Sequence, residues 1–212
     1  MAIDIIFIIL VYFFSIVMHE VSHGFVAYAL GDPTAKDAGR LTLNPLAHID
    51  PFGTVILPLL MALPAFLGAR PLIFGWAKPV PFNPMYFKNI RKGTFLVAIA
   101  GVGANFLIAV IFALILRALP GFSESLGSQT ANNLATIFST IIIANLVLGI
   151  FNCFPIPPLD GSKVLFSVLP ESFVKLQIAL ERYGIFLLLA IIFLLPEILG
   201  FLVTGAFNLL VD

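Results

Sequence analysis

Residues 3–30 read IDIIFIILVYFFSIVMHEVSHGFVAYAL, an almost continuously apolar run with a polar cluster at residues 19–23. A membrane-spanning α-helix needs about 20 mostly apolar residues, so this run predicts a span. Asp4 stands where a secretory signal would carry Lys or Arg, and no cleavage motif follows the run. We therefore expect the span to be retained.

The composition agrees with a membrane protein. Of the 212 residues, 60% are hydrophobic and 10% are charged, and the mean hydropathy is +1.10. Soluble domains carry about 25% charged residues. The net charge is zero, so we expect no nucleic-acid surface. Cys153 is the single cysteine, which excludes a disulfide or a Cys-rich metal site within this chain.

Further apolar stretches predict additional spans. Residues 94–118 and 132–154 are each long enough to cross. Residues 184–210 are also long enough, but Pro196-Glu197 either kinks one helix or divides the stretch into two. Residues 53–68 contain two prolines and are short for a span, so we expect a re-entrant segment or a short packed helix.

The basic residues indicate an orientation. Seven of the eleven Lys and Arg residues lie in residues 31–93, three lie in 156–183, and Arg117 stands alone. If residues 53–68 do not cross, ten of the eleven share one side, and Lys and Arg accumulate on the cytoplasmic side. We expect the N-terminus outside. The compact build suits a prokaryotic plasma membrane.

Residues 39–92 are predicted to be more than a linker. Residues 39–45 alternate briefly and end in a turn signal, which favours a short strand or β-hairpin. Residues 78–81, Lys-Pro-Val-Pro, predict an extended segment at the membrane interface. The expected fold is one membrane-embedded, polytopic all-α domain over residues 1–212. Its parts are a three-helix core (3–30, 94–118, 132–154), a re-entrant or β-hairpin region at 39–92, and a C-terminal helix or helices near 184–210.

The polar cluster in the first span carries the chemistry. His19-Glu20-Val21-Ser22-His23 matches the pattern H-E-x-x-H. Helical residues four apart share a face, so both imidazoles can reach one Zn²⁺ ion while Glu20 takes a proton from water. Ionisable groups inside a membrane are costly and usually functional. The alternative, a cluster that only hydrogen-bonds neighbouring helices, would be an expensive way to hold helices together.

A catalytic zinc site needs a third protein ligand beside an open position. Asp160 follows the Pro-rich turn at residues 153–159, whose prolines end a helix and orient the carboxylate. The alternative explanation for this residue is an ordinary Asp-Gly turn at a helix end. His48 is a rival ligand and Cys153 a weaker one, so the residues alone leave three candidates.

Taken together, the motifs resemble the site-2 protease family of intramembrane zinc metalloproteases. The resemblance extends over residues 11–161 and rests on His19-Glu20-Val21-Ser22-His23, Gly101-Val102-Gly103-Ala104-Asn105, Asn152 and Leu159-Asp160-Gly161. The chain resembles compact prokaryotic members, and we expect it to lack the PDZ-like insertion and CBS pair of larger ones.

The resemblance implies roles for named residues. It implies zinc bound by His19, His23 and Asp160, with Glu20 as general base and Asn152 as the donor that steadies an oxyanion. Two auxiliary residues carry alternatives. His48 is either structural or part of a gate or second metal site, and Asn105 serves either helix packing or site architecture.

The resemblance also implies the reaction. We expect hydrolysis of peptide bonds within or near transmembrane segments, as in regulated intramembrane proteolysis. Residues 40–44 would hold the unwound substrate by strand addition. The partners are a transmembrane protein or peptide and the lipid bilayer; the sequence leaves the substrate and oligomeric state open. Two alternatives are a non-catalytic metal-binding membrane protein of the same fold and a divalent-metal transporter.

Overall fold

The computed structural model describes residues 2–63, 75–194 and 196–212. Within these residues the chain is helical and contains no β-strand. The α-helices are α1 (Ala2–Ala29), α2 (Thr34–Asp37), α3 (Leu57–Ala62), α4 (Ile90–Ala118), α5 (Ser123–Leu126), α6 (Ser128–Asn152), α7 (Asp160–Val168), α8 (Val174–Leu194) and α9 (Pro196–Val211). The short 3-10 turns are η1 (Pro45–His48), η4 (Pro84–Tyr86), η5 (Leu119–Phe122) and η6 (Glu171–Phe173), and a π-helical turn η2 spans Pro51–Ile56.

Three helices among the described residues are long and apolar enough to cross a membrane. The spans are Ile6–Ala29 in α1, Ile90–Phe122 in α4 with η5, and Ser128–Asn152 in α6. This confirms the three-helix core. At about 1.5 Å per residue, α4 is about 43 Å long and exceeds the roughly 30 Å hydrocarbon layer. Large apolar side chains such as Phe14, Leu107 and Leu114 face outward, as lipid contact requires.

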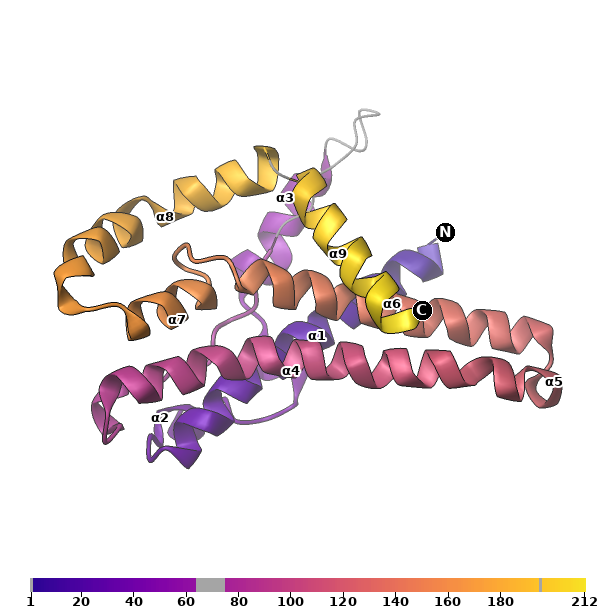
Figure 1. The fold of residues 1–212 in the computed structure, drawn as a ribbon, viewed down its shortest axis with the longest axis horizontal. Helices are drawn as coiled ribbons and strands as arrows, with labels where there is room; N and C mark the ends of the chain where they lie inside the picture. The colour runs from indigo at the N-terminus through magenta and orange to yellow at the C-terminus, as the bar shows by residue number, and fades with distance from the viewer. Residues whose placement is uncertain (1, 64–74, 195) are drawn as a thin grey trace.

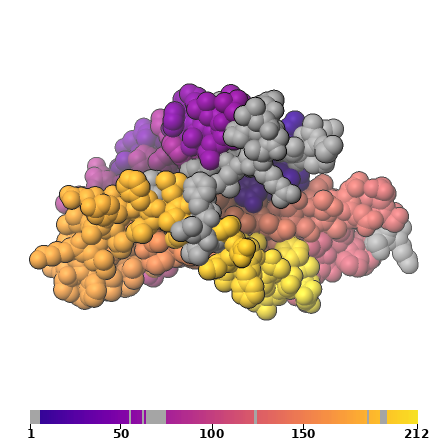
Figure 2. All heavy atoms as spheres, turned by 90° about the horizontal axis from the view of Figure 1, so that it is seen from above, coloured from indigo at the N-terminus to yellow at the C-terminus, as the bar shows by residue number. Residues whose placement is uncertain are grey.

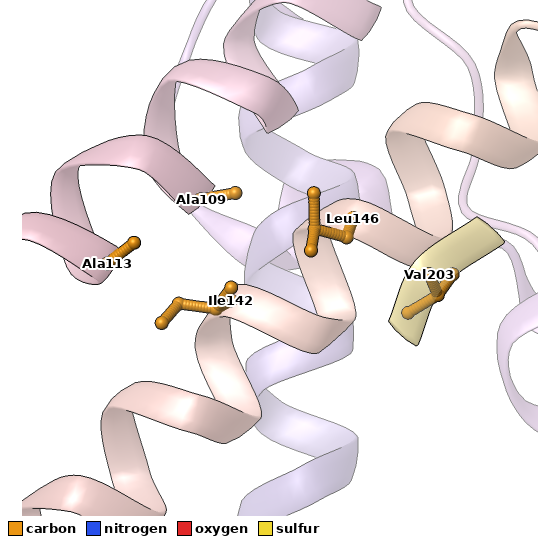
Figure 3. Packing of buried hydrophobic residues seen from close by; sticks show 5 residues of the cluster. All are labelled: Ala109, Ala113, Ile142, Leu146 and Val203. Atoms are coloured by element: carbon orange, nitrogen blue, oxygen red, sulfur yellow. The ribbon is translucent and has the colours of Figure 1, made fainter. Parts of the chain in front are cut away.

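Helix α4 is the centre of the bundle. It packs along α6 and against α1 and α7 (Figure 1). Ala109 and Ala113 of α4 pack near Ile142 and Leu146 of α6, and Val203 of α9 joins this buried cluster (Figure 3). Helices in lipid associate through close van der Waals contact, which small residues such as these alanines permit.

The predicted β-hairpin does not form at residues 40–44. The backbone bends there without strand pairing. Its polar groups bond locally instead: the Arg40 amide donates to the Ala35 carbonyl at 2.9 Å, and His48 Nε2 lies 2.8 Å from the Thr42 carbonyl. Local bonds of this kind compete with strand pairing, and the alternation of side chains could not reveal them.

The predicted re-entrant segment is helical where it is described. Residues 53–62 belong to η2 and α3, and Asp50 caps η2 by accepting hydrogen bonds from the Phe52 and Gly53 amides. Residues 64–68 of that segment lie outside the described residues. Pro51 stands at the first position of η2, after the extended residue Asp50, where a missing N–H costs nothing.

The Pro-rich segment is extended, as its composition predicts. Alternate amides, those of Trp76, Lys78 and Val80, donate hydrogen bonds toward the body of the protein. Their acceptors are the Gly53 carbonyl at 3.1 Å, the His48 carbonyl at 2.8 Å and a Glu20 carboxylate oxygen at 2.9 Å. Pro79 and Pro81 occupy intervening positions. Because alternate residues of an extended chain face opposite ways, these prolines remove no inward donor.

The C-terminal apolar stretch forms two helices. α8 ends at Leu194, and α9 begins at Pro196 with Glu197 exposed in its first turn. α9 packs on α6 and α4, whereas α8 extends away from the bundle (Figure 1). In the view from above, α9 and residues 45–54 lie on opposite sides of the molecule (Figure 2).

Candidate metal and catalytic centre

Helix α1 brings two histidines to one face. His19 and His23 are 5% and 6% exposed, and their Nε2 atoms lie 3.1 Å apart. Gly101 of α4 lies directly against the rings: a Cβ there would be 2.5 Å from His23 Nε2 and 2.7 Å from His19 Cε1. The first glycine of the Gly-x-x-x-Asn pattern therefore makes room for both imidazoles.

The turn after α6 brings Asp160 to the same point. Its Oδ2 lies 3.0 Å from Nε2 of both His19 and His23, although 141 residues separate it from His19. Within the described part of the chain, these three residues are the one cluster of three or more His, Cys, Asp or Glu that could hold a metal. Gly161 allows this turn, because a Cβ there would overlap the Cys153 carbonyl.

The hydrogen bonds behind the two rings set their tautomers. His19 Nδ1 lies 2.6 Å from Asn105 Oδ1, and His23 Nδ1 lies 2.6 Å from the Val97 carbonyl oxygen. Both oxygens only accept, so each Nδ1 carries the hydrogen of a neutral ring. Each Nε2 then turns a lone pair toward the centre of the cluster, which is the usual arrangement behind a metal-binding histidine.

This donor set fits Zn²⁺. Two imidazole lone pairs and a carboxylate oxygen face one another at 3.0–3.1 Å. They repel one another unless a cation lies among them. Ligand atoms of a tetrahedral zinc stand about 3.3 Å apart, given bonds of about 2.0–2.1 Å, and three protein ligands leave the fourth position open.

Lys163 holds the second oxygen of Asp160. Its Nζ donates to Oδ1 at 2.9 Å from one turn further along α7. The positive charge of Lys163 and this hydrogen bond both favour the ionised carboxylate. The ionised form is the one in which a carboxylate binds a metal.

Glu20 lies beside the cluster without belonging to it. It is half-buried, and its Oε2 accepts a hydrogen bond from the Val80 amide at 2.9 Å. The extended segment at residues 75–81 thus passes over the predicted general base. Sequence reasoning predicted the shape of this segment and missed its contact with Glu20, because a backbone donor leaves no signal in the sequence.

Asn152 ends α6 and is half-buried. Its Nδ2 donates to the Leu148 carbonyl at 3.0 Å in its own helix. An amide nitrogen carries two hydrogens, so this bond leaves one for another acceptor. The oxyanion role of Asn152 stays a prediction.

The rival ligands lie outside the cluster. His48 is fully buried, and its Nδ1 has no hydrogen-bond partner among the described residues. Its ring and its carbonyl join residues 40–44 to the extended segment through Thr42 and Lys78. Cys153 is exposed at the end of α6. A gating or auxiliary metal role for His48 stays a prediction.

Two buried residues beside the cluster were missed by sequence reasoning. Ser15 of α1 and Asn145 of α6 continue the hydrogen bonds that begin at Asn105. A signal was present, because both are polar residues within apolar spans. Ser15 precedes His19 by one helical turn and Asn145 precedes Asn152 by two, so each pair shares a helix face.

Comparisons with known proteins assign the chain to a family. Residues 122–195 match peptidase family M50. "Putative zinc metalloprotease YwhC" of Bacillus subtilis is 38% identical over 182 residues, which cover 86% of this chain and 77% of that relative. This chain belongs to peptidase family M50, the site-2 protease family. The M50 assignment makes it an integral membrane protein of the intramembrane zinc metalloprotease class.

More distant relatives of this M50 member carry a similar description. "Putative zinc metalloprotease Rip2" of Mycolicibacterium smegmatis is 26% identical over 87% of this chain and 65% of the relative. The protein of the same name in Mycobacterium tuberculosis is 29% identical over 88% of this chain and 66% of the relative. No solved structure gives a significant match.

Proposed function

We propose that this M50 member hydrolyses peptide bonds within or near transmembrane segments of other membrane proteins. His19, His23 and Asp160 would hold Zn²⁺, and Glu20 would be the general base. The observation that carries the proposal is the meeting of three ligand atoms at 3.0–3.1 Å, with Glu20 next to His19 on α1. The whole of residues 1–212 would act as one membrane-embedded domain.

Each side chain has a distinct task in this proposal. Bound zinc supplies Lewis acidity, which makes water a competent nucleophile near neutral pH. Glu20 takes a proton from the attacking water and returns it to the leaving amine. Asn152 donates its free N–H to the oxyanion that forms on the scissile carbonyl. Lys163 keeps Asp160 ionised and oriented through its 2.9 Å bond to Oδ1.

The proposed orientation places this chemistry near the cytoplasm. His23 and Val97 lie toward the ends of α1 and α4 that adjoin the basic segment 31–93, and Asp160 lies within the basic segment 156–183. Lys and Arg favour the cytoplasmic side, which leaves the N-terminus outside. Water would reach the site from the cytoplasm, and residues 40–44 would receive the extended substrate. A prokaryotic plasma membrane is the proposed location.

Glu20→Gln tests the proposal. The protein and a fluorogenic single-span peptide, signal-peptide-like in sequence, are reconstituted together in proteoliposomes. We expect the parent to cleave the peptide and Glu20→Gln to cleave it at least about 100-fold more slowly while retaining zinc. Equal cleavage by Glu20→Gln would remove Glu20 from the mechanism. Zinc flux into the vesicles without cleavage would indicate a transporter instead.

A further inference from the structure

A chain of buried polar groups leads from His19 into the interior of the bundle. Ser15 and His19 lie on α1, Asn105 on α4 and Asn145 on α6. Both asparagines are fully buried, and Ser15 is 5% exposed. Polar groups are costly inside a membrane protein unless they are paired, so their pairing is informative.

Each of these four buried side chains has a defined hydrogen-bond partner. Asn105 Oδ1 lies 2.6 Å from His19 Nδ1, and Asn105 Nδ2 donates to Asn145 Oδ1 at 2.9 Å. Asn145 Nδ2 donates to the Ile141 carbonyl at 2.9 Å and to Ser15 Oγ at 3.0 Å. Asn105 Nδ2 also lies 3.4 Å from the Ser15 carbonyl.

The Ile141 carbonyl sets the direction of these bonds. It can only accept, so the amide nitrogen of Asn145 must face it and the amide oxygen must face Asn105. The amide nitrogen of Asn105 then faces Asn145, and its oxygen faces His19. That oxygen only accepts, so His19 carries its hydrogen on Nδ1 and keeps a lone pair on Nε2. A backbone carbonyl of α6 thus orients a ring on α1 through two amides.

We propose that Asn145 is a positioning residue for the metal site, which fixes the tautomer and orientation of His19 through Asn105. This inference rests on the proposed role of His19 as a zinc ligand. Removing the groups that orient a metal-binding histidine typically weakens metal affinity about 10- to 100-fold. Asn145 hydrogen-bonds Asn105, Ser15 and the Ile141 carbonyl, and of these partners only Asn105 contacts a proposed ligand, so the proposed path runs through Asn105.

A purely structural role is the competing explanation. Amide side chains also join helices in membranes, and that role predicts a loss of stability that is independent of Asn105. The two explanations differ in whether the effects of changing Asn145 and Asn105 depend on each other. If Asn145 acts through Asn105, as a relay, the effect of changing Asn145 on zinc affinity disappears when Asn105 is already absent. If the two residues act independently, the effects of the two changes add.

Zinc affinity can be measured by chelator competition on the full chain in detergent, with helix content checked by circular dichroism. We expect Asn145→Leu to weaken zinc binding about 10- to 100-fold. In an Asn105→Leu background the same change should have less than about a 2-fold effect. Thr140→Val is the matched control, because among the described residues its hydroxyl bonds the Thr136 carbonyl of the same helix and no group of the metal site. It should bind zinc as the parent does.

Two further variants separate the relay from packing. Asn145→Asp, in the neutral form that burial favours, keeps one O–H donor and one oxygen acceptor in the same volume. We expect it to bind zinc within about 3-fold of the parent, because outer partners act by hydrogen bonding. Ser15→Ala leaves the Ile141 carbonyl to orient Asn145, so we expect a similarly small effect.

These measurements separate failure of the relay from failure of the proposed zinc site. If His19→Ala binds zinc like the parent, or the parent binds none, the metal assignment itself fails. If His19→Ala loses zinc but folded Asn145→Leu keeps parental affinity, the relay is overturned. Additive losses in the double variant, or a loss in Asn145→Asp as large as in Asn145→Leu, would also overturn it.

Discussion

At the scale of single residues, Gly101 shows how closely the helices must approach at the site. Its Cα faces both imidazoles, and a Cβ would lie 2.5 Å from His23 Nε2. Atoms this close cannot both keep their places, and the rings are held by their bonds to Asn105 and Val97. Any side chain at this position must therefore displace a proposed ligand.

We predict that Gly101→Ala weakens zinc binding about 10- to 100-fold, because overpacking of this kind costs about 1–3 kcal/mol. Chelator competition measures the effect. Gly103→Ala is the matched control on the same helix, since a Cβ there meets no atom within 4 Å. Equal zinc affinity in the two variants would show that the rings do not depend on the space at Gly101.

The sequence predicted the side chains that form the centre, but it did not predict what lies behind them. H-E-x-x-H spacing and the Leu-Asp-Gly turn identified His19, Glu20, His23 and Asp160 as candidates. The partner of His23 is the backbone carbonyl of Val97, and the partner of Glu20 is the amide of Val80. Backbone groups are the same in every residue, so only the fold can show which of them point at the site.

At the scale of elements, the turn between α6 and α7 places Asp160. Helix α7 begins at Asp160, and its first turn packs onto the backbone that leaves α6. A Cβ at Gly161 would overlap the Cys153 and Phe154 carbonyls. The glycine therefore allows α7 to start close to the end of α6, which brings the carboxylate to α1.

We expect Gly161→Ala to move Asp160 away from the histidines. Because this removes one of the three protein ligands, the zinc content of the purified protein should fall to less than about one tenth of that of the parent. Gly205→Ala in α9 is the control, because a Cβ there meets nothing within 4 Å and alanine favours a helix. Full zinc content in Gly161→Ala would mean that the turn does not govern the position of Asp160.

Element types were predicted best for the long apolar stretches. The predicted spans at residues 94–118 and 132–154 appear as α4 (Ile90–Ala118) and α6 (Ser128–Asn152); both helices begin four residues earlier than predicted, and α6 also ends two residues earlier. The β-hairpin was wrong, because residues 40–44 bond to Ala35 and His48 rather than to a neighbouring strand. A short alternating pattern carries no information about such local partners.

At the scale of the whole molecule, the orientation in the membrane can be tested with the single native cysteine. Cys153 is exposed at the end of α6 that adjoins the proposed site, and Asn132 is exposed near the other end of the same helix. A helix of this length spans the hydrocarbon layer, so the two positions lie on opposite sides.

We predict that a membrane-impermeant maleimide labels Cys153 in inside-out vesicles and not in right-side-out vesicles. Asn132→Cys in a Cys153→Ser background should show the reverse. Partial desolvation of the sulfur at this helix end and the nearby Asp160 charge raise the pKa of the Cys153 thiol, so labelling should accelerate as the pH rises above neutral. Labelling of Cys153 from the outer side would reverse the proposed topology.

The central claim is that His19, His23 and Asp160 hold one zinc ion, and zinc per chain in the purified protein tests it most directly. The comparison is between the parent, Asp160→Ala and His48→Ala, each checked for helix content. We predict about one zinc in the parent and in His48→Ala, and almost none in Asp160→Ala. Zinc retained by Asp160→Ala, or lost from a folded His48→Ala, would contradict the proposed site.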